Sequence, residues 1–146
     1  MARPPRYRIA DTAQQMVGGF LLAGPFVVTE EVWVLAANMS TFHTVAVVAI
    51  VVAIGYGALY KADDDRDPEA EAEVAGIPIR FVSLMAVSFG SVSVLALAFT
   101  APDTFLVEGE VLSDPTPMAV TETTLKAVSV GAIFSVVGAA TADSVF

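Results

Sequence analysis

The chain has 146 residues, of which 55% are hydrophobic, and a mean hydropathy of +0.71. Its apolar residues fall in long blocks, which excludes an ordinary soluble domain. The net charge of -9, from 16 acidic and 7 basic residues, makes nucleic acid an unsuitable partner. Dense acidic charge with little Lys is typical of a high-salt cytosol, so we predict a halophilic archaeal source. The absence of cysteine excludes disulfides and thiolate metal sites.

The apolar blocks predict membrane-spanning helices, because each approaches the roughly 20 residues that a helix needs to cross the hydrocarbon core. The helices are expected roughly over 12–38, 42–61, 77–101 and 119–143. So few residues separate the first two that they must form an antiparallel hairpin. We therefore predict an all-α membrane protein, a single domain over 1–146 in a lipid bilayer, with four transmembrane helices in an antiparallel bundle. An acidic loop (62–76) and an outer loop (102–118) complete it.

The distribution of basic residues predicts the orientation. Six of them precede the first block or flank the middle loop: Arg3, Arg6, Arg8, Lys61, Arg66 and Arg80. The other two connections contain none, and Lys126 is the single exception. Because Lys and Arg favour the cytoplasmic side, we expect both termini and the acidic loop to be cytoplasmic, in the cell membrane.

Small side chains form stripes on two of the predicted helices. They recur at helical spacing at Gly131, Ser135, Gly138 and Ala142 of the last block and at Ala86, Gly90 and Ser93 of the third. Such stripes permit close helix contact. Packing inside one subunit is the favoured interpretation, and a homo-oligomer interface is the alternative.

The most informative polar feature is a pair of carboxylates, Glu30 and Glu31, inside the first block. They stand about eight residues from its outer end, or roughly 12 Å along a straight helix. A charge near mid-membrane costs about 2.5–3.5 kcal/mol on insertion scales, so it usually faces a protein interior or a wet cavity. Glu31 lies on the same helix face as Asn38, which gives it the more polar stripe.

A helix break is expected just before these acids. Pro25 cannot donate to the carbonyl of Leu21, so we expect the first helix to be kinked near Pro25. Freed carbonyls beside a carboxylate are suited to cation binding. The sequence therefore predicts that Glu31 binds or relays a proton or small monovalent cation. The neighbouring site residues are Glu30, Thr29 and Asn38, with Pro25, Trp33 and Lys126 in support.

A structural role for the acids is the alternative hypothesis. Lys126 lies about seven residues into the last block, at a depth close to that of Glu31, so it could form an ion pair with Glu30 or Glu31. The protein would then be a non-transporting structural or accessory membrane protein. Glu122 precedes Lys126 by four residues and is a second candidate partner on the same helix.

The segment GGFLLAGPFVVTEEVW resembles the first membrane helix of domain-of-unknown-function family 2391, integral membrane proteins of archaea and bacteria. Pro25, Thr29, Glu31 and Trp33 match the family's pattern, whereas Glu30 stands where the family tends to have an apolar residue. The last block, ETTLKAVSVGAIFSVVGAA, is also similar to a late helix of that family. The resemblance implies the membrane class and no activity.

Enzyme, metal and cofactor chemistry are not expected. His43 is the only histidine, so a multi-histidine metal site cannot form. Asp63, Asp65 and Asp67 alternate as at the start of a calcium-binding loop. That loop needs Gly at its sixth and Glu at its twelfth position, where this chain has Pro68 and Val74.

Overall fold

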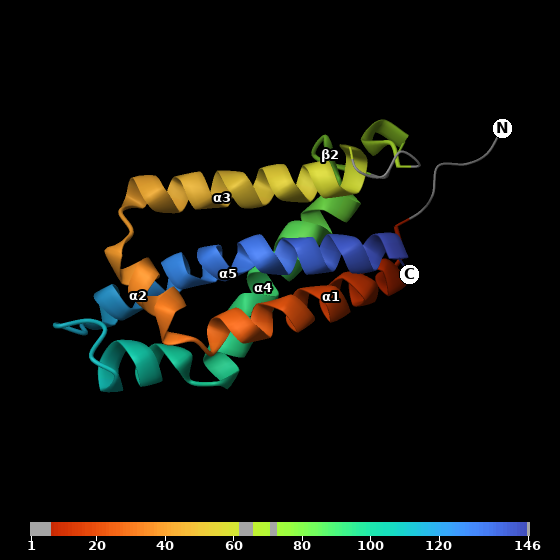
Figure 1. Ribbon diagram of the computed structural model, residues 1–146. Coiled ribbons are helices and arrows are strands. Elements are labelled where there is room, and N and C mark those ends of the chain that lie inside the picture. The colour runs from red at the N-terminus through yellow and green to blue at the C-terminus, as the bar shows by residue number, and fades with distance from the viewer. Residues whose placement is uncertain (1–6, 62–65, 71–72, 146) are drawn as a thin grey trace.

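The computed structural model describes residues 7–61, 66–70 and 73–145, and it is a bundle of long helices (Figure 1). The α-helices are α1 (Ile9–Val27), α2 (Glu30–Asn38), α3 (Thr41–Tyr56), α4 (Ile79–Ala98) and α5 (Pro117–Val145). Shorter elements are the π-helical η1 (Gly57–Lys61) and η3 (Pro102–Glu108), the 3-10 helix η2 (Pro68–Ala70), and the strands β1 (Glu73–Val74) and β2 (Ile77–Pro78).

The chain runs back and forth along the bundle, so that α1 and α5 bring both described ends to the same end of the molecule (Figure 1). We call this the inner end, and the opposite end, with α2 and η3, the outer end. α5 is central and packs against α1, α2, α3 and α4. Of its most apolar stretch 61% is buried, against 17% for α3 with η1. α3 therefore presents most of its apolar surface outward, as a lipid-facing helix does.

Three helices are long and apolar enough to cross a membrane: Thr41–Lys61, Ile79–Ala98 and Pro117–Val145. α1 and α2 are long and apolar enough only when taken together, as a pair bent by 81°. The described residues therefore contain three candidate spans, or four if the bent pair is one span. These helices confirm the all-α membrane fold and the bent first helix. The bend follows Pro25 by several residues, because α1 continues to Val27 and the backbone becomes extended at Thr29 (φ -109°, ψ 129°).

Two glycines allow α1 and α5 to approach closely. A Cβ added to Gly18 would lie 2.0 Å from the carbonyl oxygen of Gly138, so neither position can hold a side chain without moving the backbones apart. Ser135 donates a hydrogen bond to the carbonyl of Gly19 at 3.1 Å beside this crossing. The small-residue stripe of the last helix therefore packs inside the chain. In α4, a Cβ added to Gly90 would meet nothing within 4 Å.

Buried apolar side chains form two clusters along the bundle. The outer cluster surrounds Trp33, and the inner one contains Leu59, Leu84 and Val136. Each draws on α4 and α5, which therefore provide the continuous core. α1, α2 and the η3 segment complete the outer cluster, and α3 with η1 completes the inner one.

The connections contain local structure of their own. β1 and β2 pair through a turn in which Ala75 and Gly76 both have positive φ (53° and 82°), the geometry of a type I′ hairpin. The segment 102–118, expected as a loop, begins with the π-helical η3. Asp63 and Asp65 lie outside the described residues, as do Arg3 and Arg6.

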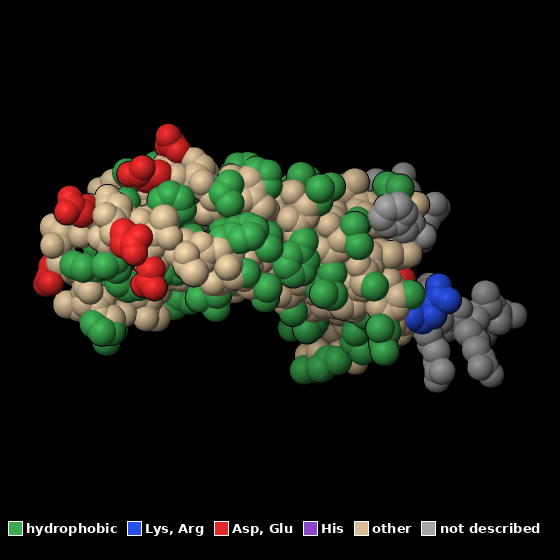
Figure 2. All heavy atoms as spheres, turned by 90° about the horizontal axis from the view of Figure 1, so that it is seen from below, with side chains coloured by type: hydrophobic (Ala, Val, Ile, Leu, Met, Phe, Trp, Pro, Cys, Tyr) green, Lys and Arg blue, Asp and Glu red, His purple; other side chains and the backbone are tan. Residues whose placement is uncertain are grey.

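On the face in Figure 2, acidic side chains lie at the outer end and basic ones at the inner end, although the inner end also carries acids such as Glu69, Glu73 and Asp143. The elements of the outer end carry exposed acids: Glu30, Glu31, Asp103, Glu108, Glu110, Asp114 and Glu122. The described basic residues of the inner end are Arg8, Lys61, Arg66 and Arg80. At the outer end, Lys126 is the sole basic residue among those described.

Candidate functional site

Glu30 and Glu31 form the first turn of α2, directly after the bend. Both residues are exposed. The Thr29 hydroxyl donates a hydrogen bond to the Glu31 carboxylate. Acidic residues in the first turn of a helix are favourable, because backbone N–H groups there are unpaired and the helix dipole is positive. The local sequence thus explains both carboxylates as helix-starting residues.

The expected depth of the two acids assumed a straight first helix, and the structure has a bent one. Because α2 turns away from α1 by 81°, the residues after Thr29 do not continue along the α1 axis. Glu30 and Glu31 therefore stand at the outer end of the bundle, in contact with the exterior of the chain. Their assignment as a proton or cation site stays a prediction.

Lys126 contacts other groups than the acids of α2. Its ammonium donates to the carbonyl oxygen of Met39 at 2.7 Å and lies 3.1 Å from the Glu122 carboxylate. The sequence allows Lys126 to pair with an acid of α2 or with Glu122, and in the structure it pairs with Glu122. No described cation lies within ion-pair distance of Glu30 or Glu31.

Asn38 lies at the far end of α2, where its side chain donates to the carbonyl of Val34 at 3.0 Å. It is separated from Glu31 by about two helical turns, or roughly 10 Å of helix. The structure therefore does not bring the amide and the carboxylate together. Pro25 is exposed within α1, on the other side of the bend.

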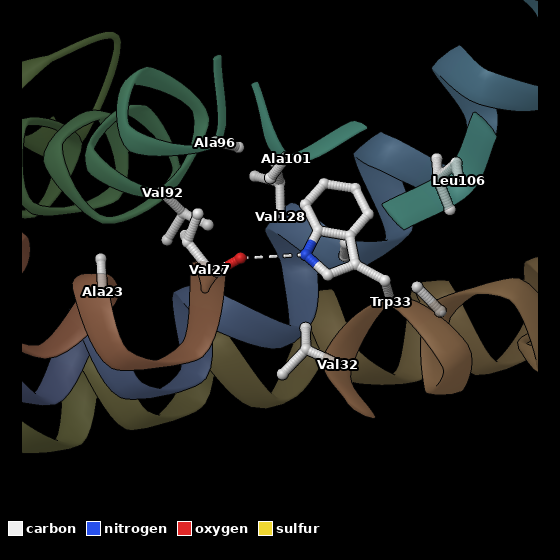
Figure 3. Packing of buried hydrophobic residues seen from close by; sticks show 11 residues of the cluster. Ala23, Val27, Val32, Trp33, Val92, Ala96, Ala101, Leu106 and Val128 are labelled. Atoms are coloured by element: carbon white, nitrogen blue, oxygen red, sulfur yellow. Dashed lines mark hydrogen bonds between the residues drawn. The ribbon is translucent and has the colours of Figure 1, made fainter. Parts of the chain in front are cut away.

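Trp33 holds the bend in place (Figure 3). Its indole Nε1 donates a 3.0 Å hydrogen bond to the carbonyl of Val27, one of the last carbonyls of α1, and its ring stacks on Phe105 of η3. The residue is only 1% exposed. The pocket bordered by Trp33 has no space that admits a water molecule. Trp33 is therefore a packing and capping residue at the centre of the outer cluster.

A buried ion pair lies at the inner end and was not predicted from the sequence. Asp143 of α5 has a side chain with no exposed surface, 2.7 Å from the guanidinium of Arg80 in the first turn of α4. Gln15 of α1, itself fully buried, donates to the second carboxylate oxygen at 3.2 Å. Arg66 lies 3.9 Å from that oxygen. We call Asp143, Arg80 and Gln15 the inner clamp, since they join three helices.

A chain of hydroxyl groups continues the inner clamp toward the surface. The Tyr7 hydroxyl lies 2.6 Å from both Thr12 and Ser83, and the Ser83 hydroxyl donates to the Gln15 side-chain oxygen at 2.7 Å. Arg80 stands over the Tyr7 ring, with the guanidinium carbon 5.2 Å from the ring centre. These contacts satisfy the donors and acceptors that burial would otherwise penalise.

The inner clamp is chemically suited to holding helices together. A carboxylate and a guanidinium that are buried together compensate each other's loss of solvation, and both gain from the hydrogen bonds around them. One sequence signal pointed to it: Asp11 and Gln15 are four residues apart and share a face of α1. Asp11 lies 3.7 Å from Arg80. That spacing indicates a polar face but not its partners on α4 and α5.

Comparison with known families agrees with this architecture. Residues 4–143 match the model of domain-of-unknown-function family 2391, described as "Putative integral membrane protein (DUF2391)". The chain belongs to the DUF2391 family. The match covers nearly all of this DUF2391 chain, including every helix of the bundle except the last residues of α5. No curated protein and no solved structure matches it. The family description assigns the membrane class and no activity.

Proposed function

We propose that the protein is a non-transporting structural or accessory protein of the cell membrane, whose helices are held by the inner clamp. The observation that supports this proposal is the pairing of the buried Asp143 carboxylate with Arg80 and Gln15. A buried carboxylate that relayed ions would need water or an exchangeable partner beside it. Here the carboxylate oxygens are occupied by side chains from two other helices.

The packing of the outer half favours the same proposal. The pocket between Trp33, α4 and α5 excludes water, so it offers no wet route from Glu31 into the bundle. Close packing also separates this region from the inner clamp, because the helices α1 and α5 touch at Gly18 and Gly138. A rigid, closed bundle of this kind suits a protein that acts through its surface.

The second candidate function is the binding or relay of a proton or monovalent cation through Glu31. It is favoured by the acidic outer end, where exposed carboxylates around Glu30 and Glu31 would concentrate cations. A pathway would then have to form between copies of the chain. The uncovered small-residue face of α4 at Ala86 and Gly90 is the surface that a homo-oligomer would use.

Ion flux separates the two candidates. The full chain and its Glu31→Gln variant are reconstituted into vesicles with an internal pH dye, and H⁺, Na⁺ and K⁺ gradients are imposed in turn. We expect both to leak at the rate of protein-free vesicles. Flux above that rate in the wild type, lost in Glu31→Gln, would refute the structural proposal and support the second candidate. Flux that is equal in both variants and above the rate of the protein-free vesicles would refute both.

We also propose that both termini and the acidic middle loop face the cytoplasm. Arg8, Lys61, Arg66 and Arg80 lie toward the inner end, whereas Lys126 is the basic residue of the outer one. This asymmetry supports the inner end as the cytoplasmic end.

A further inference from the structure

A cavity of about 450 Å³ lies at the inner end, where the last turns of α3 meet the start of α4 and the β-hairpin. Its size is within the range of small-molecule sites, roughly 300–1,000 Å³. No residue of the inner clamp borders it. The cavity is lined by Val52, Ala53, Tyr56, Pro68, Glu69, Glu73, Gly76, Ile77, Pro78 and Phe81.

Aromatic rings form one side of this cavity. The rings of Tyr56 and Phe81 meet edge to face with their centres 5.9 Å apart, and Tyr60 extends the group at 5.0 Å from Tyr56. Tyr56 is 38% exposed, so its ring is accessible from outside the chain. Faces of Tyr and Phe rings attract cations, because the ring quadrupole is negative there.

Two acidic residues, Glu69 and Glu73, also line the cavity. Both are exposed, and neither forms an ion pair with a described residue. Arg66, the nearest described cation in sequence, lies against Asp143 and Ser144 of α5. Among the described residues, the lining therefore combines two negative charges with aromatic rings and contains no positive charge.

The position of the cavity adds a second constraint on its ligand. Val52 and Ala53 belong to the apolar stretch of α3 that is long enough to cross a membrane, whereas Glu69 and Glu73 belong to the polar connection. The cavity thus extends from the membrane-facing surface of α3 to the polar end of the bundle. A ligand with a charged head and an apolar remainder matches this order of residues.

We propose that this cavity binds the ammonium group of an organic cation, with Glu69 and Glu73 balancing its charge and Tyr56 and Phe81 contacting its alkyl and N–H or N-methyl groups. Two sources share this chemistry: the amine headgroup of a membrane lipid and a free alkylammonium ion. The binding site is distinct from Glu31 and from the inner clamp, so it does not depend on the function proposed above.

The first test measures free cations and lipids in separate arms. The full chain in detergent is titrated with tetramethylammonium chloride and with ethylammonium chloride, and contact is followed by saturation-transfer NMR. In the second arm, the chain is exposed to mixed micelles of phosphatidylethanolamine and phosphatidylglycerol, and retained lipid is counted by native mass spectrometry. We expect binding in at least one arm, with phosphatidylethanolamine retained over phosphatidylglycerol where lipid is bound.

Variants locate the contact. Glu69→Gln combined with Glu73→Gln should weaken binding roughly 5-fold, and Tyr56→Leu roughly 3-fold or more, whereas Tyr56→Phe keeps the ring and should stay within about 2-fold of the wild type. Glu108→Gln combined with Glu110→Gln removes the same charge at the outer end and is the matched control. Thermal unfolding of each variant checks that the fold is intact.

The outcomes are distinguishable. Binding of free cations alone supports a soluble ligand, and selective retention of phosphatidylethanolamine supports a lipid headgroup. Absence of binding in both arms overturns the proposal. Equal retention of phosphatidylglycerol, or equal losses in the Glu69/Glu73 and Glu108/Glu110 variants, also overturns it, because the effect would then be one of overall charge.

Discussion

The carboxylate of Asp143 and the guanidinium of Arg80 lie 2.7 Å apart, although 63 residues separate them in the chain. Asp143 stands near the end of α5 and Arg80 near the start of α4, so one contact joins the two spans that provide the continuous core. Gln15 adds α1 to the same carboxylate. A buried ion pair of this kind adds little net stability, whereas removing one partner is strongly destabilising because the other charge is then buried without compensation.

Asp143→Asn should therefore be strongly destabilising. The substitution preserves the shape of the side chain but removes the negative charge that lies 2.7 Å from the buried Arg80 guanidinium. We expect a loss of about 3–5 kcal/mol, the range seen when one partner of a buried ion pair is removed. Thermal or denaturant unfolding in a mild detergent, followed by circular dichroism, measures the change.

Glu122→Gln is the matched control for that experiment. It removes the exposed carboxylate of the i,i+4 pair with the part-buried Lys126, whose ammonium keeps its hydrogen bond to the Met39 carbonyl, and should change stability by less than about 0.5 kcal/mol. The combination Asp143→Leu with Arg80→Met should recover part of the loss, since it removes both charges of the closest pair, although Gln15, Arg66 and Asp11 each lose one partner. Similar losses for Asp143→Asn and Glu122→Gln would contradict the assigned role of the inner clamp.

Gly18→Ala should disrupt the crossing of α1 and α5. The new Cβ would lie 2.0 Å from the backbone oxygen of Gly138, and a backbone atom cannot move aside as a flexible side chain can. We expect a destabilisation of about 1–3 kcal/mol or more from this overlap. Unfolding measurements as above would detect it.

Gly24→Ala, in the same helix, tests whether that loss comes from the crossing. A Cβ at Gly24 meets nothing within 4 Å, so only the better helix propensity of Ala should act, with a gain of up to about 1 kcal/mol. A stabilising Gly24→Ala beside a destabilising Gly18→Ala is the expected pair. Two losses of the same size would instead indicate that α1 tolerates no substitution.

The membrane class and the bent first helix could be predicted because both depend on local sequence. Long apolar runs define spans irrespective of their neighbours, and Pro25 marks a weak point in the first run. The place of the bend could not be predicted. It lies beyond Val27, where Trp33 caps the end of α1 and packs on Phe105, a contact between segments far apart in sequence.

The inner clamp could not be predicted for a related reason. Its residues come from three separate helices, and nothing in the sequence of one helix says which face of another it meets. Asp143 and Arg80 each stand close to a predicted span end, where a charged residue is ordinarily solvated. A straight first helix would place Glu31 deep in the membrane, at a high insertion cost, but the 81° bend places it at the outer end.

Phe105→Ala should expose the sole tryptophan of the protein. Trp33 is 1% exposed and its ring stacks on Phe105 with centres 6.0 Å apart, so its emission should be blue-shifted and poorly quenched by acrylamide. Removing the Phe105 ring opens the outer cluster, and we expect a red shift, stronger quenching and a loss of about 3 kcal/mol. Phe42→Ala, at a residue that is 78% exposed, should leave the emission unchanged. A Trp33 quenched fully in the wild type would refute this packing.

Cysteine labelling tests the orientation directly, because the natural chain contains no cysteine and gives no background. Ser113 is exposed between η3 and α5 at the outer end, and Ser144 is exposed near the end of α5 at the inner end. In intact cells a membrane-impermeant maleimide should label Ser113→Cys and not Ser144→Cys, while both should be labelled after permeabilisation. The physical reason is the excess of basic residues at the inner end, which favours retention on the cytoplasmic side. Labelling of Ser144→Cys alone would invert the topology, and equal labelling of both in intact cells would require dual insertion.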